Sequence, residues 1–292
     1  GQSNSAGYSR DFCIDPPSMD VHLYRNRSKW DIASHPMNES TFAGSLANEE
    51  MGVPGVSPYL AFGKTYGKMT GMPVGLIQTS LGGSPMERWN PEDGDLYLNM
   101  LDKIHETGGR YAGVLWYQGC SDTNPGPAEK YLEHFREYVE ATRKELGYEV
   151  PFFTMQLNRQ INGINDECWG MVRDAQARAA KEIPGVSVLT TSNLSLCDGI
   201  HNTAQANVAL GEKLAKQCAH VLNGKEEYQP PELVKVERAD EAERKSFQLE
   251  GSGIWLKLTC DHVKNCFLVY SAVGKDSGFT LTDSEGEVEI LH

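Results

Sequence analysis

The sequence predicts an α/β fold: a three-layer α/β/α domain with a central parallel sheet, followed by a small antiparallel β unit. Three observations support this prediction. Short apolar runs recur along the first two thirds of the chain, amphipathic segments separate them, and short alternating segments replace both near the end. Strands that alternate with helices are typical of a sheet covered by helices on both faces.

The apolar runs are the predicted strands of the central sheet. They are rich in Val, Leu, Ile and Phe, and they lack the polar–apolar alternation of a strand with one face in water. Continuous runs of this kind are typical of parallel strands buried on both faces. The predicted strands cover residues 74–79, 112–117, 151–157 and 186–191.

The amphipathic segments are predicted helices, and their ends carry the usual signals. One begins at Pro127 and ends at Gly147, and another ends at Gly71, shortly before Pro73. Residues 8–50 are polar and irregular, and we expect them to form a long excursion near one edge of the sheet. The predicted helices cover residues 57–71, 127–147, 167–185 and 202–224.

The pattern changes near residue 225, which predicts a domain at 1–224 and an accessory β domain at 225–292. Residues 224–245 carry a Pro pair and many charges, and the segments after them alternate between turn residues. A hairpin there would also let Cys260 and Cys266 face each other and form a disulfide bond. The predicted strands cover residues 253–260, 265–272, 278–283 and 287–291.

Charge and cysteine content exclude some classes of function. The chain has 40 acidic and 27 basic residues, a net charge of −13, which repels phosphate backbones and argues against a nucleic-acid partner. No apolar run approaches the roughly 18 residues needed to cross a bilayer, so we expect no membrane partner. The seven cysteines include no C-x-x-C pair, which argues against a zinc site and slightly favours a reducing compartment such as the cytoplasm.

Candidate catalytic residues follow the predicted strands. Ser3 lies in "GQSNSAG" among small residues, where a nucleophile is accessible, although a serine there also suits a helix N-cap. Asp198 and His201, three residues apart in "LCDGIHNTAQ", follow a predicted strand and precede a helix. This spacing lets the carboxylate bind one ring nitrogen while the other nitrogen faces a serine hydroxyl. The alternative is an ordinary turn beside a helix cap.

Two further loops offer donors for an oxyanion. "SLGGSPMERW" provides a glycine pair after the strand at 74–79, and "WYQGCSD" provides the Gln118 amide after the strand at 112–117. Acyl transfer needs N–H groups aimed at the developing negative charge. We therefore predict that Ser3 N–H, Gly82 N–H and the Gln118 side chain form the oxyanion hole, although each loop also fits a plain connection.

The order of these blocks resembles a known family. "GQSN", "GGSPMERW", "WYQGCSD" and "DGIH" resemble the four blocks of the SGNH hydrolases, and most of all the branch of sialate O-acetylesterases and related carbohydrate acetylesterases. "WGMVRDAQ" (169–176) is similar to that branch's W-x-x-x-R-x-x-Q helix, and "SGFTLTDSEGEVEIL" (277–291) to the β unit that follows its catalytic domain. The resemblance covers residues 1 to about 220 and the tail.

The resemblance implies roles for individual residues. Ser3 matches the nucleophile, His201 the base and Asp198 its carboxylate partner, and no metal or organic cofactor is implied. Polar and aromatic residues of the same loops suit a polyol substrate: Gln2, Arg88, Trp89 and Asp122.

The sequence departs from the branch at four positions. Ser5 replaces Met, Ser84 replaces Thr and Asn202 replaces Pro, and all three changes look tolerable. Cys120 replaces the Glu of Q-G-E and puts a thiol beside the predicted oxyanion loop. This change leaves open whether the protein is a catalyst.

We therefore expect a serine esterase that removes O-acetyl groups from carbohydrate, with O-acetylated sialic acid favoured. The net charge disfavours an anionic substrate unless an arginine such as Arg10 or Arg88 binds its carboxylate. Acetylxylan or another neutral glycan, a non-catalytic carbohydrate-binding relative, and a lipase or thioesterase are the alternatives. Because a nucleophile two residues from a free terminus would be mobile, we also expect a buried strand upstream of Gly1 in the natural polypeptide.

Overall fold

The computed structural model describes residues 1–26, 28–38, 54–225, 232–238, 240–242, 256–261, 267–270, 279–283 and 286–289. The described residues fall into two compact units, one up to residue 225 and one made of the strands after it. The predicted boundary at residue 225 stays a prediction, because residues 226–231 lie outside the described ones. None of the described helices is long and apolar enough to cross a membrane.

The first unit contains the predicted parallel sheet, in two three-stranded parts. In the first part, β1 (Val21–Arg25) lies between β2 (Lys29–Ile32), antiparallel to it, and β3 (Val74–Leu76), parallel to it. In the second part, all strands are parallel: β4 (Val114–Trp116), β5 (Phe152–Met155) and β6 (Val186–Leu189). The four predicted strands are confirmed, each shorter than expected.

Gly1 and Gln2 connect the two parts of the sheet. The Leu81 N–H donates to the Gly1 carbonyl (2.9 Å), and the Gln2 N–H donates to the Tyr117 carbonyl (3.0 Å). The start of the chain therefore lies between the segments that leave β3 and β4. This position delivers Ser3 to the edge of the sheet where parallel strands end, which is where α/β proteins bind their ligands.

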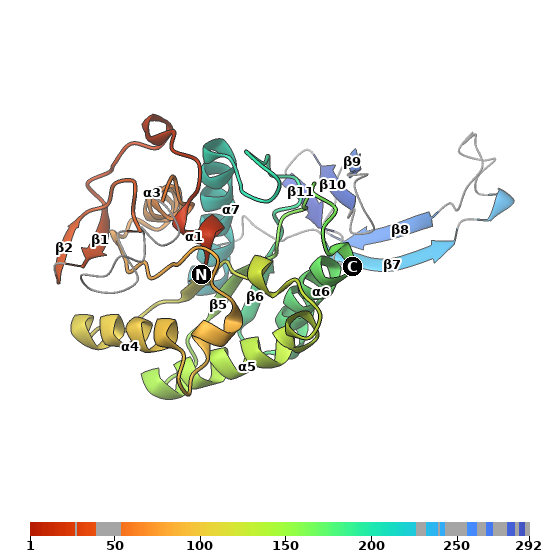
Figure 1. The fold of residues 1–292 in the computed structure, drawn as a ribbon. Helices are drawn as coiled ribbons and strands as arrows, with labels where there is room; N and C mark the ends of the chain where they lie inside the picture. Colours follow the sequence, from red (N-terminus) through yellow and green to blue (C-terminus); the bar gives the residue numbers. More distant parts are fainter. Residues whose placement is uncertain are drawn as a thin grey trace. The chain divides into compact units, whose positions relative to one another are not determined.

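Helices cover both faces of this sheet, as expected (Figure 1). One layer contains α3 and α7, which pack closely: a Cβ added to Gly211 of α7 would lie 2.1 Å from the Pro58 carbonyl oxygen. The other layer contains α4, α5 and α6 (Figure 1). Their bounds are α3 Tyr59–Thr70, α4 Asp95–Thr107, α5 Pro127–Leu146, α6 Asp166–Glu182 and α7 Ala204–Asn223.

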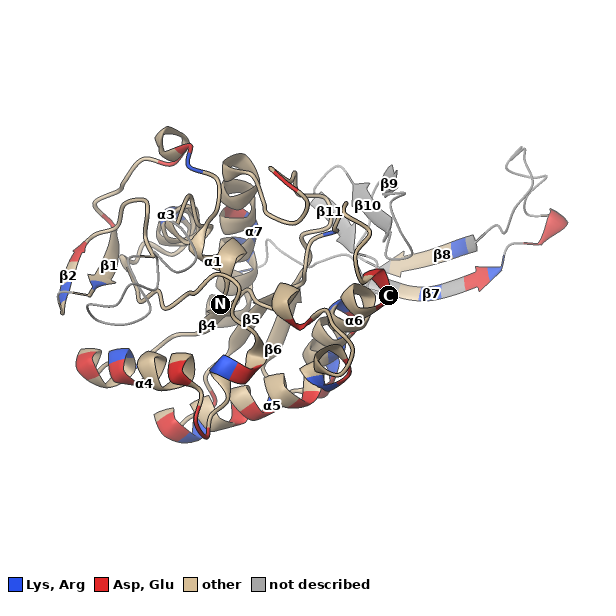
Figure 2. Cartoon of the chain, viewed as in Figure 1, with Lys and Arg blue, Asp and Glu red and all other residues tan. Residues whose placement is uncertain are grey.

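A cluster of aromatic rings lies in the core between the sheet and the helices. Trp116 of β4 packs against Tyr138 of α5 and Trp89, with ring centroids 4.5 and 5.1 Å apart. Strands β4, β5 and β6 carry no charged residue, while acidic and basic residues are interleaved along α4 and α5 (Figure 2). Burial of these rings contributes about 1.5–3 kcal/mol each, so this layer anchors the strands that carry the site loops.

A cavity of 480 Å³ lies between β3 and β4. Side chains of α3, α4 and both strands line it, including Phe62, Met100 and Leu115. Ser3 and His201 do not line it. The cavity therefore is not where the candidate catalytic residues meet.

Several elements differ from the sequence-based expectation. The stretch at 8–50 was expected to be irregular, but it contains the hairpin β1–β2. The second strand is polar, with Lys29 and Asp31 exposed, so the sequence pattern did not indicate a strand there. This hairpin does occupy the edge of the first part of the sheet, as expected of the excursion. Helix α4 and the short α1 (Ser3–Ala6) were not predicted.

The second unit is a five-stranded sheet of order β8-β7-β11-β10-β9. Three of its four strand pairings are antiparallel, as predicted, and β11 pairs with β7 in parallel. Strand β7 lies in the charged stretch that the sequence pattern did not identify as a strand. The proposed Cys260–Cys266 disulfide involves Cys266, which lies outside the described residues. The strands are β7 Glu232–Arg238, β8 Leu256–Asp261, β9 Phe267–Tyr270, β10 Phe279–Asp283 and β11 Gly286–Glu289.

Candidate active site

Ser3 is the first residue of α1, a helix of four residues. Its side chain is partly exposed, while the next three residues of the helix are buried. Ser5 anchors the helix, since its hydroxyl bonds the Ser80 hydroxyl (2.9 Å) and the hydroxyl of Tyr59. The serine at position 5, where the branch has Met, thus forms two hydrogen bonds. These bonds hold α1, and with it Ser3, in a fixed position.

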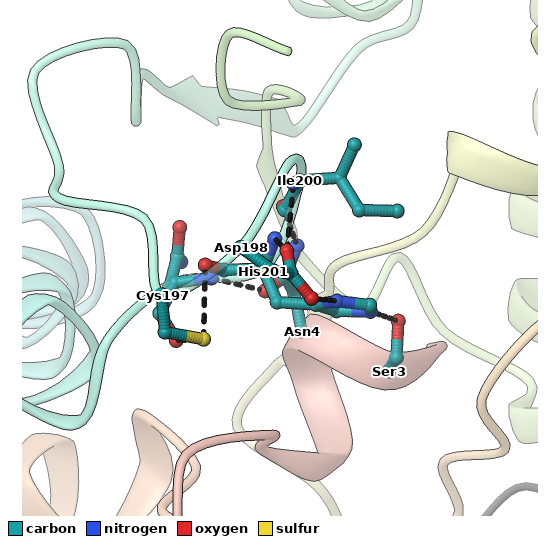
Figure 3. A network of polar contacts seen from close by, with 7 residues as sticks. Ser3, Asn4, Cys197, Asp198, Ile200 and His201 are labelled. Carbon is teal, nitrogen blue, oxygen red and sulfur yellow. Dashed lines mark hydrogen bonds and ion pairs between the residues drawn. The ribbon is translucent and has the colours of Figure 1, made fainter. Parts of the chain in front are cut away.

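A chain of hydrogen bonds connects Ser3, His201 and Asp198 (Figure 3). The Ser3 Oγ lies 2.9 Å from His201 Nε2, and His201 Nδ1 lies 2.6 Å from Asp198 Oδ2. Because a carboxylate accepts hydrogen bonds, it keeps the imidazole proton on Nδ1 and leaves Nε2 as the acceptor for the serine hydroxyl. The structure brings together the three residues that the sequence nominated from opposite ends of the first unit.

The loop after β6 holds Asp198 as a carboxylate. Burial acts to raise its pKa, but the Ile200 N–H (2.8 Å), the His201 ring and the His201 N–H (2.7 Å) together lower the pKa below its ordinary value. One carboxylate oxygen accepts both backbone N–H groups, so the other is aimed at the ring. Asp198 is therefore fixed in orientation and ionised at neutral pH.

Asn4 connects the segment of Ser3 with the segment of His201, and the sequence pattern did not indicate this role. Its Nδ2 donates to the Ile200 carbonyl (3.1 Å), and its Oδ1 accepts the Asn202 N–H (2.9 Å). These bonds bracket His201 on both sides along the chain. Its place directly after Ser3 in the "GQSN" block was the one signal in the sequence, and the structure shows that this amide is buried.

Asn202 replaces the branch's usual Pro and is completely buried. Its side chain accepts from Asn158 (2.8 Å) and donates to Asn207 (3.0 Å) and the Tyr117 hydroxyl (3.3 Å). Three of the four groups are amides with matched donors and acceptors. The substitution therefore ties the His201 loop to the loop after β5 and to α7.

The predicted oxyanion donors divide into two kinds. Among the described residues, the N–H groups of Ser3 and Gly82 have no bonded acceptor, and the bond from Leu81 to Gly1 brings Gly82 to the edge of the sheet where Ser3 lies. Gln118 is different: its side-chain amide donates to Ser84 O (3.0 Å) and Asp122 Oδ2 (2.5 Å), and the residue is wholly buried. Both amide hydrogens are used, so the expectation that Gln118 donates to an oxyanion is corrected.

Three of the four predicted substrate contacts are also corrected. Gln2, Trp89 and Asp122 are each 3% exposed or less, and each is bonded inside the protein. Gln2 Oε1 accepts the Gly119 N–H (2.8 Å), and Trp89 donates to the Ser84 hydroxyl (3.1 Å). As they lie here, these side chains support loops and offer no surface to a substrate.

The arginines suggested for a substrate carboxylate lie at the surface. Arg88 makes a two-point ion pair with Asp95, at 3.1 and 2.6 Å, so its guanidinium already binds a carboxylate of the protein. Arg10 is exposed in the segment after α1.

Asp122 joins two loops rather than facing a substrate. It accepts the Met86 N–H at 3.0 and 3.2 Å and the Gln118 amide. Burial raises the pKa of its carboxyl, and the bonds from Met86 and Gln118 oppose that shift only in part. The residue connects the loop after β3 to the loop after β4.

Cys120 stands where the branch has Glu. Burial raises the pKa of its thiol to about 12. A thiol is a nucleophile only as thiolate, and this shift keeps the Cys120 thiol protonated at neutral pH. Position 120 therefore supplies no competing nucleophile beside Ser3.

Helix α6 supports all three loops that leave the second part of the sheet. Trp169 donates to the Asn158 carbonyl (2.8 Å) and Arg173 to the Ser192 hydroxyl (2.7 Å). Gln176 donates to the Gln118 carbonyl (2.9 Å) and accepts from the Leu157 N–H (2.8 Å). The three side chains of the W-x-x-x-R-x-x-Q segment, about one per helical turn, together form hydrogen bonds with all three loops.

The described residues contain no group of three or more His, Cys, Asp or Glu side chains arranged to hold a metal ion. The hydrogen-bonded chain consists of a hydroxyl, an imidazole and a carboxylate. This set can activate a serine for attack on an ester carbonyl.

Known proteins resemble this chain along most of its length. Residues 1–220 match the family described as "Carbohydrate esterase, sialic acid-specific acetylesterase". A probable carbohydrate esterase of Arabidopsis thaliana is 27% identical over 197 residues, which are 64% of this chain and 70% of that protein.

Solved structures share the fold. An X-ray structure of an Arabidopsis thaliana protein superposes with a TM-score of 0.65 at 23% identity, covering 76% of this chain and 96% of its own. A carbohydrate acetylesterase of Xanthomonas citri gives 0.64 at 19% identity, covering 99% and 71%, and NanS gives 0.63 at 12%, covering 77% and 96%. The three-layer α/β fold is thus shared with these proteins. Since the family match spans most of the chain and includes every loop of the site, the chain belongs to the sialic acid-specific acetylesterase family of carbohydrate esterases, a group of carboxylic ester hydrolases.

Proposed function

We propose that the protein removes O-acetyl groups from sialic acid, through a Ser3–His201–Asp198 triad and an acetyl-enzyme intermediate. The observation that carries this proposal is the 2.9 Å contact between Ser3 Oγ and His201 Nε2, with Asp198 behind the ring. The family description supports sialic acid as the sugar, and the carbohydrate acetylesterase of Xanthomonas citri, with the same fold, supports acetyl as the acyl group.

In the first half-reaction, His201 Nε2 takes the Ser3 hydroxyl proton as Oγ forms a bond to the acetyl carbon. The carbonyl oxygen becomes an oxyanion, for which the N–H groups of Ser3 and Gly82 are the proposed donors. The bond from carbon to the sugar oxygen then breaks, and His201 returns the proton to that oxygen. The sugar leaves with a free hydroxyl, and Ser3 remains acetylated.

In the second half-reaction, a water molecule replaces the sugar. His201 takes a proton from water as the water oxygen bonds to the acetyl carbon, and then protonates Ser3 Oγ as the ester breaks. Acetate is released and the enzyme is restored. Asp198 stays ionised throughout and stabilises the imidazolium that forms twice per cycle.

The substrate is tested by comparing acetate release from O-acetylated sialic acid with release from acetylxylan. The proposal predicts a higher kcat/KM on the sialic acid ester and a Ser3→Ala variant that is inactive on both. A preference for acetylxylan overturns the sugar assignment and leaves the triad standing. Equal rates for parent and Ser3→Ala overturn the mechanism.

A further inference from the structure

Tyr8 lies flat against the imidazole of His201. The two ring centroids are 3.9 Å apart and the planes differ by 5°. Tyr8 is nevertheless 48% exposed, so burial in the core is not what places the ring there. Another feature of the fold must therefore hold this exposed aromatic side chain against the proposed base.

The backbone on both sides of Tyr8 is fixed. The Gly55 N–H donates to the Gly7 carbonyl (2.8 Å), and the Val56 N–H donates to the Ser9 carbonyl (2.7 Å). The two backbone segments approach so closely that only glycine fits at two positions. A Cβ on Gly7 would lie 2.5 Å from the Val56 carbonyl carbon, and a Cβ on Gly55 would lie 2.1 Å from the Ser9 carbonyl oxygen. Gly7 also has a φ of +90°, a backbone angle that residues other than glycine rarely adopt.

The same segment is tied to the His201 loop. The Val56 carbonyl accepts the side chain of Asn207 (2.7 Å), and Asn207 accepts that of Asn202, the residue after His201 (3.0 Å). One short path of backbone and amides therefore connects the backbone beside Tyr8 with the backbone beside His201.

We propose that Tyr8 is a positioning residue for His201, an inference that rests on the proposed function. Its ring covers one face of the imidazole, restricts rotation of the base away from Ser3, and presents a π face to the positive charge that His201 acquires when it takes the serine proton. An aromatic face attracts a cation within about 6 Å of its centroid, so the interaction is stronger in the imidazolium state than in the ground state.

The other groups around His201 do not supply this effect. Asp198 contacts Nδ1 and Ser3 contacts Nε2, and both nitrogens lie at the edge of the ring. From the neighbouring segments, Cys197 donates its thiol to the His201 carbonyl, Asn4 is neutral, and Cys120 carries a thiol with a raised pKa. Substitution of Tyr8 leaves every one of these groups in place and removes only what covers the ring face.

The test measures Tyr8→Ala, Tyr8→Phe and Tyr8→Trp on p-nitrophenyl acetate, which carries no sugar. Trp30→Ala is the matched control, because Trp30 is also an aromatic residue, 47% exposed, and lies on β2. We expect Tyr8→Ala to lower kcat about 3- to 30-fold with little change in KM, and to move the acidic limb of the pH–rate profile down by about half a pH unit. Phe and Trp restore both values, and Trp30→Ala changes neither.

The outcomes separate this proposal from the one it rests on. A parent that loses its rate in Ser3→Ala, with Tyr8→Ala unchanged in kcat and pH profile, overturns the positioning role alone. So does a Tyr8→Ala variant that raises KM on a sugar ester but keeps its rate on p-nitrophenyl acetate, since Tyr8 then contacts substrate instead. A parent no faster than Ser3→Ala overturns the proposed function and this inference together.

Discussion

Two loops at the same edge of the sheet, residues 197–202 after β6 and residues 118–122 after β4, use their polar side chains in opposite ways. In the first, the side chains of His201 and Asp198 are 14% and 37% exposed, and the His201 ring contacts the Ser3 hydroxyl. In the second, Gln118 and Asp122 are buried, and their hydrogen bonds connect one loop to another.

The difference in exposure distinguishes side chains that are candidates for the chemistry from side chains that stabilise the loops. Polar residues in motif positions follow the strands in both loops, so the sequence pattern alone gives them equal standing. The partly exposed set can reach a substrate, whereas the buried set fixes the loops from which N–H groups are presented. Burial is the largest single cause at both carboxyl groups. The bonds from Ile200 and His201 together outweigh it and lower the Asp198 pKa, whereas burial prevails at Asp122 and raises the pKa there.

The largest expected effect is at the nucleophile. Ser3→Ala removes the hydroxyl that His201 faces, and we expect kcat on p-nitrophenyl acetate to fall by about a thousandfold or more with an unchanged melting temperature. Ser9→Ala, a change of the same size in the next segment, is the control and should retain the parent rate. A Ser3→Ala variant as fast as Ser9→Ala would show that Ser3 is not the nucleophile.

Asp198→Asn tests the orientation of the base. An asparagine amide facing His201 favours the wrong tautomer, with the proton on Nε2, and we expect kcat to fall by about a hundredfold to ten-thousandfold. The measurement is steady-state kinetics on p-nitrophenyl acetate, with circular dichroism as the check on folding. If Asp198→Asn retained the parent rate, the carboxylate would have no part in the reaction. The loop at 197–202 would then not differ from the loop at 118–122 in the way proposed.

Asp122→Ala tests the second loop, and its main effect should fall on stability. It leaves the Met86 N–H and the Gln118 amide without an acceptor, which should lower the free energy of unfolding by about 2–4 kcal/mol in a urea titration. The folded fraction should keep activity within about tenfold of the parent. A variant of parent stability with no activity would move Asp122 into the chemistry.

The pH dependence of stability should also differ between the two carboxylates. The folded-state pKa of Asp122 is raised above its ordinary value of 3.8, so the folded state binds the proton more tightly than the unfolded state. The stability that this group contributes is therefore present below pH 3.8 and is lost as pH rises through the folded-state pKa. The Asp198 pKa is lowered, so the stability it contributes is present above 3.8 and is lost as pH falls below it. Asp122→Asn should remove the first dependence and Asp198→Asn the second, as measured by urea midpoints across pH. The same pH dependence in both variants would contradict the opposite shifts.

The smallest effect is expected at Cys120. Because its thiol has a pKa of about 12, Cys120→Ala should change kcat by about threefold or less. Steady-state rates before and after treatment with a thiol reagent check this directly. A large loss in Cys120→Ala would show that the residue in place of the branch's Glu takes part in the reaction.

The sequence was informative where hydrophobic pattern and chemistry coincide. The strands at 114–116, 152–155 and 186–189 are apolar on both faces, and Ser3, Asp198 and His201 follow from residue type, spacing and order. The hairpin β1–β2 was missed because its second strand is polar and exposed, and β7 because seven residues among charges show no clear period.

The site was harder to predict in one respect. Whether a side chain faces a substrate or a neighbouring loop depends on long-range packing, so Gln118, Trp89 and Asp122 could not be told from catalytic groups by position. Tyr8 carries no motif, and its contact with His201 arises from a path through Gly55, Val56 and Asn207, residues distant in sequence from both rings. Only the folded chain brings them together.

In the proposed triad, the His201 ring activates the hydroxyl of Ser3. Labelling the parent with a fluorophosphonate and locating the adduct by peptide mass spectrometry tests it most directly, because this reagent reacts with a serine whose hydroxyl is activated by a base. We predict a single adduct on Ser3 in the parent and none in His201→Ala. An adduct on another serine, or labelling of Ser3 that persists in His201→Ala, would contradict the account.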